Sequence, residues 1–300
     1  MMCVPFVLAA LAGNAPPAPP PPPPLSWSAG FSSDMVLQAT KSEGVAVYGL
    51  ALKASAAVTV SVTGPNGHYT VAATTVSTGV NGSAWRAVLK PAPASHDEYT
   101  ISASCAGCAP ASSISLERVV FGSVYLCSGQ SNMALATHYS FSRPVLEAAI
   151  RAGKYTNIRT FLYGGMSVDS SIFHADTPKY ATTDGSVPWN NMSYGVTAPP
   201  PPGRGGLRPF EQFSATCTYF GVGLVDLGLD TPIGLIQSAV GGMQIEAYLD
   251  NETLNTCANE SGYTWNTSNP SQNIGYSLSS KLFYGMITPF VNMSLSGWAW

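Results

Sequence analysis

The stretch Val119-Val-Phe-Gly-Ser-Val-Tyr-Leu-Cys-Ser-Gly-Gln-Ser-Asn-Met133 decides the fold. Its first eight residues, Val119 to Leu126, form an apolar run of the length expected for a buried strand. Gly129-Gln-Ser-Asn132 then ends the run where a following helix would begin, so Ser131 is expected on a tight turn. In a parallel α/β sheet this position lies at the carboxyl edge of the strands, where functional residues gather.

Downstream of Arg118 the pattern alternates between strands and helices. Further strands are predicted at 157–162, 232–238 and 295–300, and helices at 144–153, 213–229 and 278–291, with Ser214 as a candidate N-cap. The alternation predicts βαβ units and therefore an α/β fold over residues 116–300, with a doubly wound parallel sheet between two helical layers. The polar, proline-rich segment 180–208 is expected to be a surface loop bordering the site.

Residues 25–115 have a different pattern. Short β-branched runs recur at a spacing of roughly ten residues, as expected for strands joined by turns. The turn signals include Gly64-Pro-Asn-Gly67 and Asn81-Gly82. This pattern predicts a small antiparallel β-sandwich that precedes the α/β domain.

Residues 1–24 are expected to lie outside the folded body. Met1 to Ala15 is typical of a short signal peptide and Pro16 to Pro24 of a stiff spacer, with a disordered N-terminus as the alternative. The longest apolar stretch, Val4 to Ala12, is too short to span a bilayer. A glycoprotein that is secreted, or lysosomal within the secretory pathway, is also favoured by six Asn-X-Ser/Thr sequons, at Asn81, Asn191, Asn251, Asn259, Asn266 and Asn292.

The composition excludes several classes of partner. Charged residues make up only 10% of the 300 residues and the net charge is −3, so neither nucleic-acid binding nor a polybasic contact with a membrane surface is expected. Membrane insertion is not expected either, because the longest apolar stretch is too short. Cys105-Ala-Gly-Cys108 has no second cysteine pair and no nearby histidine, which argues against zinc and leaves a tight disulfide or two free thiols. No metal and no cofactor are predicted, and no oligomeric state is indicated.

Two predicted strand ends carry residues suited to acyl transfer. Ser131 would lie beside the unpaired N–H groups of a helix start, which favour developing negative charge, although it could serve only as an N-cap. Gly241 and Gly242 would expose backbone N–H groups of the kind that form an oxyanion hole, although a glycine turn can also be required by backbone geometry alone. The presence of both features at strand ends of one sheet favours an acyl-transfer site.

These elements resemble the sialate O-acetylesterase family of SGNH-type hydrolases. The resemblance extends from about residue 25 and rests on Asp34-Met-Val-Leu-Gln38, Leu126 to Met133, Phe213 to Cys217, Pro232 to Ser238, Gly241-Gly-Met-Gln-Ile-Glu-Ala-Tyr248 and Leu282 to Pro289. It implies an SGNH-hydrolase-like fold with Ser131 as the catalytic nucleophile and an oxyanion donor at Gly242 or Gly241. Met243 stands where the family commonly has Thr, which implies a differently shaped acyl pocket.

The same resemblance places two parts of the family's site beyond Trp300. Gly297-Trp-Ala-Trp300 resembles the start of a strand that precedes a further amide donor, and the family's Asp-X-His base follows later still. A C-terminally truncated esterase is therefore expected. None of the four histidines is expected to act as the base. His68 and His96 fall in predicted loops of the β-module. His138 follows Ser131 on the first predicted helix and points away from it, and His174 lies in a sequence unlike the family's motif.

The expected activity is removal of O-acetyl groups from sialic acids by a serine carboxylic-ester hydrolase acting through an acetyl-enzyme. The expected partner is an O-acetylated sugar or glycan. Two alternatives remain open. One is an esterase for acetylated polysaccharide, of the acetylxylan type, and the other is a non-catalytic carbohydrate-binding protein with the same fold.

Overall fold

A computed structural model describes most of the chain. It covers residues 24–53, 55–77, 82–108, 112–164, 186–201, 205–250, 252–254, 256–257 and 282–300. The expected signal peptide and nearly all of the proline spacer lie outside these residues. Among the described residues, no helix is long and apolar enough to cross a membrane.

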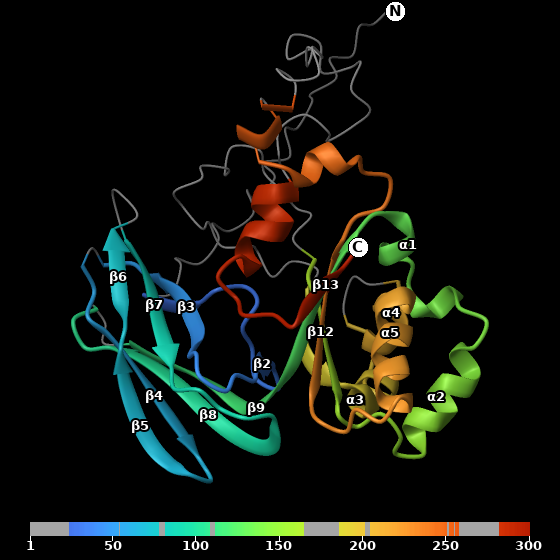
Figure 1. The fold of residues 1–300 in the computed structure, drawn as a ribbon, viewed down its shortest axis with the longest axis horizontal. Coiled ribbons are helices and arrows are strands. Elements are labelled where there is room, and N and C mark those ends of the chain that lie inside the picture. The colour runs from blue at the N-terminus through green and yellow to red at the C-terminus, as the bar shows by residue number, and fades with distance from the viewer. Residues whose placement is uncertain are drawn as a thin grey trace, which may run out of the picture.

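The order of elements follows the predicted change from strands to alternating strands and helices (Figure 1). The strands are β1 Leu25–Trp27, β2 Val36–Gln38, β3 Val45–Ala51, β4 Val58–Gly64, β5 Gly67–Ala72, β6 Thr74–Ser77, β7 Ser83–Leu89, β8 Ser95–Cys105, β9 Ser112–Gly129, β10 Ile158–Leu162, β11 Val187–Asn191, β12 Ile233–Ala239 and β13 Gly297–Ala299. The α-helices are α1 Ser131–Ala134, α2 Arg143–Arg151, α3 Met192–Thr197, α4 Pro209–Gln212 and α5 Ala215–Asp226. Tighter or wider helical turns cover Thr137–Tyr139, Ile245–Tyr248, Phe283–Ile287 and Thr288–Phe290.

The N-terminal half contains two antiparallel sets of strands. One is a four-stranded sheet in the order β1-β3-β7-β6, and the other is formed by β9, β8, β4 and β5. Side chains from both sets share one apolar core; for example, Val47 and Trp85 belong to the first set, and Val60 and Ile101 to the second. The alternation of side chains along each strand explains this arrangement, because β4 and β7 bury every second residue while the residues between them are exposed or half-buried.

Strand β9 runs through both halves of the chain. Its first part pairs antiparallel with β8, and its second part, from Ser123 to Gly129, pairs parallel with β12. It therefore crosses the predicted domain boundary at residues 115 and 116 without a break, as Figure 1 shows. The division into residues 25–115 and 116–300 stays a prediction.

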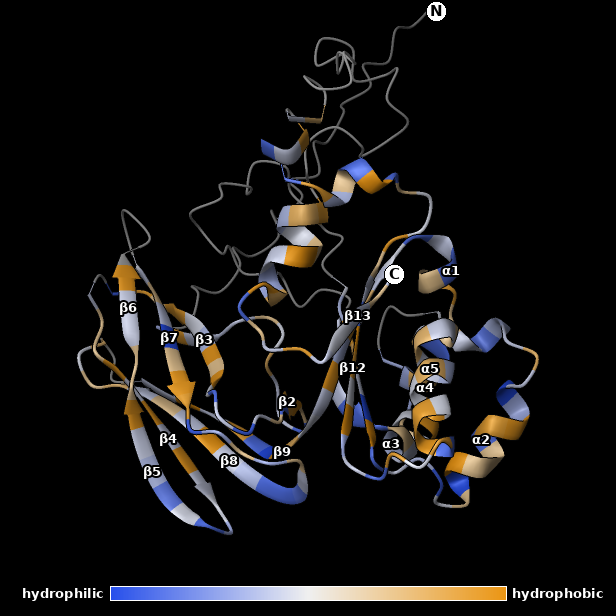
Figure 2. Cartoon of the chain, in the orientation of Figure 1, coloured by the Kyte–Doolittle hydropathy of each residue, from blue (hydrophilic) through white to orange (hydrophobic). Residues whose placement is uncertain are grey.

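The second half of the sheet is parallel where the site is expected. β10, β12, β9 and β13 run in one direction, so their carboxyl ends meet at one edge of the sheet, and β11 adds an antiparallel edge strand. Helices α2, α3, α4 and α5 cover one face through a second apolar core, and Figure 2 shows hydrophobic residues along both α2 and α5. On the other face lie the turn Phe283–Ile287 and the core of the antiparallel strands.

Helices α2 and α5 form where the sequence predicts them. Pro144 lies in the first turn of α2, and Leu146 and Ile150 are its buried residues, four positions apart on one face. The Ser214 hydroxyl caps α5 by accepting a hydrogen bond from the Cys217 N–H at 3.1 Å. At Gly221 the helix lies so close to β12 that a Cβ would come within 2.7 Å of a Leu235 methyl group.

Three predictions of local structure need correction. Segment 180–208 is not a plain surface loop, because 187–197 forms β11 and α3; Val187 and Trp189 are buried by strand alternation, and the Asn191 side chain caps α3. In the predicted helix 278–291, the described residues 283–290 form a π-helical turn followed by a 3-10 turn, with Pro289 unable to continue an α-helical ladder. The last strand covers only Gly297–Ala299 rather than 295–300.

A network of charged side chains fixes α4 against α2. The Arg208 guanidinium contacts Glu147 at 2.6 Å and Glu211 at 2.9 Å, and Arg143 contacts Glu211 at 2.8 Å. The Arg208 side chain, which donates to the Glu211 carboxylate, lowers the pKa of that carboxyl to about 2. The carboxylate of Glu211 is thus ionised throughout the physiological range.

Candidate active site

Ser131 lies at the carboxyl end of β9, as its sequence context predicts. The strand ends at Gly129, which adopts a φ of +138°, and α1 begins two residues later at Ser131. Helix α1 is a single turn with no side-chain cap, so its first N–H groups have no partner within the helix. The Ser131 side chain is exposed. The structure therefore presents a serine hydroxyl beside backbone donors at the edge of the sheet.

Gly241 and Gly242 lie at the end of the neighbouring strand β12. A Cβ placed on Gly241 would lie 3.6 Å from the Ser131 Cα and 3.8 Å from its Cβ, so the two turns are in contact. Gly242 has a φ of +77° and open space where a side chain would project. Both glycines are exposed. The structure thus brings together the three residues that the sequence singled out.

Tyr248 joins the same two strand ends and was not singled out from the sequence. Its hydroxyl donates to the Gly129 carbonyl at 2.7 Å and accepts from the Val240 N–H at 3.0 Å. Burial raises the pKa of Tyr248 to about 12, so the phenol keeps its proton and remains a donor at neutral pH. No local pattern could have indicated this role, because the contacts depend on how residues 241–248 fold back over the sheet edge.

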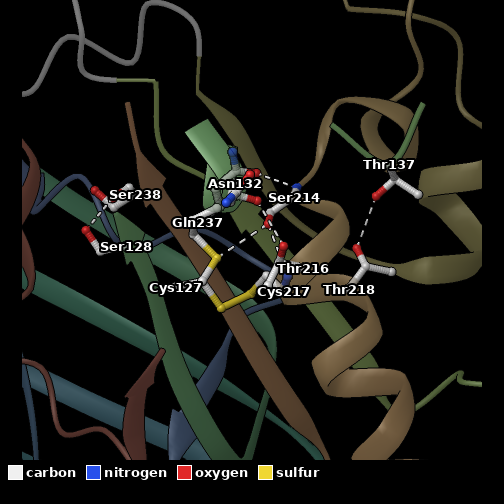
Figure 3. The surroundings of a disulfide bond; sticks show 11 residues. Cys127, Ser128, Asn132, Thr137, Ser214, Thr216, Cys217, Thr218, Gln237 and Ser238 are labelled. Atoms are coloured by element: carbon white, nitrogen blue, oxygen red, sulfur yellow. Dashed lines mark hydrogen bonds between the residues drawn. A yellow bond between two sulfur atoms is a disulfide. The ribbon is translucent and has the colours of Figure 1, made fainter. Parts of the chain in front are cut away.

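The disulfide between Cys127 and Cys217 anchors the strand that leads to Ser131. It links the carboxyl-terminal part of β9 to the first turn of α5, and both half-cystines are buried (Figure 3). Close by, the Thr216 hydroxyl donates to the Asn132 carbonyl at 2.9 Å, and the Gln237 side-chain oxygen accepts from the Ser214 N–H. Helix α5 is therefore tied both to β12 and to the turn that carries Ser131.

The second disulfide answers a question left open by the sequence. Cys105 and Cys108 are bonded to each other, which selects the tight disulfide over two free thiols. Cys257 is exposed and unpaired. No cluster of three or more potential metal ligands is present among the residues that the structure describes.

The described histidines have partners away from Ser131. His138 lies on the turn Thr137–Tyr139 rather than on the first helix, and its Nδ1 is 3.0 Å from the Arg143 guanidinium and 3.9 Å from a Glu211 oxygen. His68 and His96 lie on strands β5 and β8, not in loops, and contact the Thr63 hydroxyl and the Asp230 carbonyl respectively. His174 lies outside the described residues.

Two of the six sequons can be placed in the structure. Asn191 and Asn292 are both exposed, and the Asn191 Oδ1 accepts the capping hydrogen bond from the Tyr194 N–H at 2.8 Å. Asn81, Asn251, Asn259 and Asn266 lie outside the described residues.

The architecture is similar to that of a solved structure. The fold matches a carbohydrate acetylesterase from Xanthomonas citri with a TM-score of 0.61 and 20% sequence identity, over 91% of this chain and 50% of that one. The α/β fold expected from the sequence is thereby confirmed. No family model matches the chain.

Curated relatives confirm the more particular resemblance. The chain is 28% identical to the sialate O-acetylesterases of Pongo abelii and Homo sapiens over 275 residues, which is 90% of this chain and 46% of each relative. It is 26% identical to the sialate O-acetylesterase of Mus musculus in an alignment of 291 residues, which covers 89% of this chain and 49% of the relative. The chain therefore resembles the sialate O-acetylesterases and spans about half the length of the curated relatives it matches.

Proposed function

We propose that the protein is a serine carboxylic-ester hydrolase that removes O-acetyl groups from sialic acids. The observation that carries the proposal is the contact between Ser131 and Gly241 at the carboxyl edge of two parallel strands. This arrangement puts a hydroxyl nucleophile beside backbone amides, which acyl transfer requires. The names of the relatives support both the ester chemistry and the sialic acid substrate.

In the proposed reaction the Ser131 Oγ attacks the carbonyl carbon of the acetyl group. The resulting oxyanion accepts hydrogen bonds from the N–H groups of Ser131 and Gly242, with Gly241 as the alternative second donor. Collapse of this intermediate breaks the bond to the sugar oxygen, which leaves as a hydroxyl after protonation. Water then hydrolyses the acetyl-enzyme, releasing acetate and the free serine. The proposal needs neither a metal nor a cofactor.

The base that accepts the Ser131 proton is proposed to lie outside the described residues. His68, His96 and His138 each make contacts elsewhere, and the His138 Nδ1 lies 3.0 Å from the Arg143 guanidinium. A serine hydroxyl is a weak nucleophile without an adjacent base, so this residue is required for turnover.

An exposed site suits an acetyl group carried by a bulky glycan. Ser131, Gly241 and Gly242 are all exposed, so a sugar ring can approach with its ester pointing to the turn. The same openness would admit an acetylated polysaccharide, and the name of the Xanthomonas citri neighbour, a carbohydrate acetylesterase, is compatible with this second candidate substrate. Location in the secretory pathway is part of the proposal, supported by the exposed sequons and by two disulfides of a kind that persists in oxidising compartments.

Acetate release by the full-length protein tests the proposal. O-acetylated sialic acid, acetylated xylan and an aryl acetate are compared for the wild type, Ser131→Ala and a control, Ser142→Ala. Ser142 is also exposed and begins a helix without a side-chain capping bond, so its loss should leave turnover unchanged. We expect Ser131→Ala to lose more than about 99% of turnover on every substrate, since only oxyanion stabilisation and binding remain.

The substrate ranking distinguishes the candidates. Higher kcat/KM on the sialic acid ester supports the main proposal, and higher kcat/KM on xylan supports the second candidate. Turnover by Ser131→Ala close to that of the wild type would show that Ser131 is not the nucleophile. Binding of the glycans without acetate release by the wild type would identify a non-catalytic carbohydrate-binding protein.

A further inference from the structure

The hydroxyl of Tyr248 forms a three-way junction between the two strand ends. It donates to the Gly129 carbonyl at 2.7 Å and accepts from the Val240 N–H at 3.0 Å, and that N–H also lies 3.0 Å from the Gly129 carbonyl. The pairing of β9 with β12 ends one residue earlier in β12, at Gly129 opposite Ala239. The Tyr248 hydroxyl therefore reinforces the last backbone hydrogen bond between the two strands, which the Val240 N–H donates to the Gly129 carbonyl.

The junction stands immediately before both turns of the proposed site. Ser131 follows Gly129 by two residues, and Gly241 follows Val240 directly. Beyond the junction, the contact between the turns is the approach of Gly241 to Ser131, where a Cβ would lie 3.6 Å from the Ser131 Cα. The two exposed turns thus begin directly after a backbone hydrogen bond that one buried hydroxyl reinforces.

The ring of Tyr248 is fixed in position by burial and by packing. Tyr248 is buried, its neighbour Ala247 is fully buried, and both belong to the helical turn Ile245–Tyr248. The ring also packs edge-on against Trp300 with the centroids 4.9 Å apart. Because the packing involves only the ring, a phenylalanine would retain it and lose only the two hydroxyl hydrogen bonds.

We infer that Tyr248 is a positioning residue for ester hydrolysis, which sets the distance between the Ser131 nucleophile and the oxyanion donors at Gly241 and Gly242. This inference rests on the proposed function. Tyr248 acts through the backbone of the two turns and touches neither substrate nor the reacting atoms. Its loss should therefore slow the chemical step while leaving substrate binding nearly unchanged.

The test is steady-state hydrolysis of an aryl acetate by the full-length Tyr248→Phe protein, assayed well below its Tm. Tyr48→Phe is the matched control, because the Tyr48 hydroxyl donates to the Pro289 carbonyl at 2.6 Å, a main-chain bond between other elements. We expect kcat of Tyr248→Phe to fall by about 10- to 100-fold with KM within about threefold of wild type, the range expected for a misplaced reacting group. Both Tyr→Phe variants should show similar, small decreases in Tm, and Tyr48→Phe should keep its kcat.

Ser131→Ala, measured alongside, separates this inference from the proposed function. If Ser131→Ala is inactive and Tyr248→Phe keeps kcat within threefold of wild type, the positioning role is wrong and the proposed function stands. An equal loss of kcat in Tyr48→Phe, or a rise in KM that accounts for the whole loss of kcat/KM in Tyr248→Phe, would show general loosening and overturn the inference. If Ser131→Ala retains activity, the proposed function fails and the positioning role fails with it.

Discussion

Gly242→Val tests whether the backbone amide at this position stabilises the oxyanion. Gly242 has a φ of +77° and no atom within 4 Å of a prospective Cβ, so the new side chain meets strain but no collision. A β-branched residue at positive φ is a conformational outlier that costs about 1–3 kcal/mol. Relief of this strain rotates the local backbone and turns the Gly242 N–H away from its present direction.

Two magnitudes follow from this change. The strain should lower Tm by about 2–4 °C for each kcal/mol in a chain of this size. Misplacing one oxyanion donor should lower kcat by about 10²–10³-fold, which corresponds to about 2.7–4 kcal/mol of transition-state stabilisation. The kinetic effect should therefore persist at temperatures where the variant is fully folded.

Gly206→Val is the matched control for Gly242→Val. Gly206 has the same φ of +77° and equally open surroundings, but it lies in the segment before α4. Thermal unfolding and aryl acetate hydrolysis are measured for both variants of the full-length protein. We expect similar losses of Tm in the two variants and a loss of kcat in Gly242→Val alone.

Normal turnover by a folded Gly242→Val protein would refute the assignment of this amide. Gly241 would then be the remaining candidate among the two glycines. Gly241→Ala would be the gentlest probe, because its methyl group would make ordinary van der Waals contact with Ser131 at 3.6–3.8 Å.

Three further predictions concern the framework and the histidine nearest to Ser131 in sequence. Replacing both half-cystines of Cys127–Cys217 by alanine should lower the free energy of unfolding by about 3–5 kcal/mol in chemical denaturation, because this bridge closes a 90-residue separation. The same change at Cys105–Cys108, which closes a separation of three, should cost far less. Equal losses in the two variants would contradict this prediction. The depressed pKa of Glu211, about 2 against an ordinary 4.5, contributes stability that is complete above pH 4.5 and is lost as the pH falls toward 2. Glu211→Gln should therefore reduce the fall of Tm between pH 4.5 and pH 2. An unchanged dependence of Tm on pH would show that this carboxylate is not the cause of the acid sensitivity. His138→Gln should leave kcat within about threefold of wild type, because the His138 side chain contacts Arg143 and is not the proposed base. Loss of a general base lowers the rate by about 10²-fold or more, so a loss of that size would make His138 a candidate for the base.

The parts of the fold that the sequence predicts are those with strong local patterns. The run from Val119 to Leu126 can be buried on both faces only in the middle of a sheet, and it forms the centre of β9. Ser214 has both the position and the hydroxyl of an N-cap, so the start of α5 follows from local chemistry alone. For the same reason the two strand ends bearing Ser131 and Gly241 could be located before their contact was known.

Features that depend on distant partners could not be predicted. The apolar residues of β11, Val187 and Trp189, are separated by Pro188 and flanked by polar residues, which is a weak signal for a strand. The strand forms because β10 offers it a free edge for pairing. Whether Cys127 pairs with Cys217 depends on how α5 packs against β9, which sequence spacing does not determine. The position of Tyr248 likewise depends on a loop that returns to the sheet.

The alignment of the proposed site is a direct consequence of strand register. Gly129 pairs with Ala239 where the two strands end, and two residues beyond each of these ends lie Ser131 and Gly241, the residues in contact. A slip of one residue would displace the two turns by about 3.3 Å, beyond the misplacement of roughly 1 Å that already costs an enzyme about 10²-fold in rate. Close packing opposes such a slip: any Cβ at Gly122 would collide with the Pro232 carbonyl, and one at Gly234 would press on Val36 at 2.9 Å. The glycines buried in the strands therefore fix the spacing of the exposed residues proposed to carry out the chemistry.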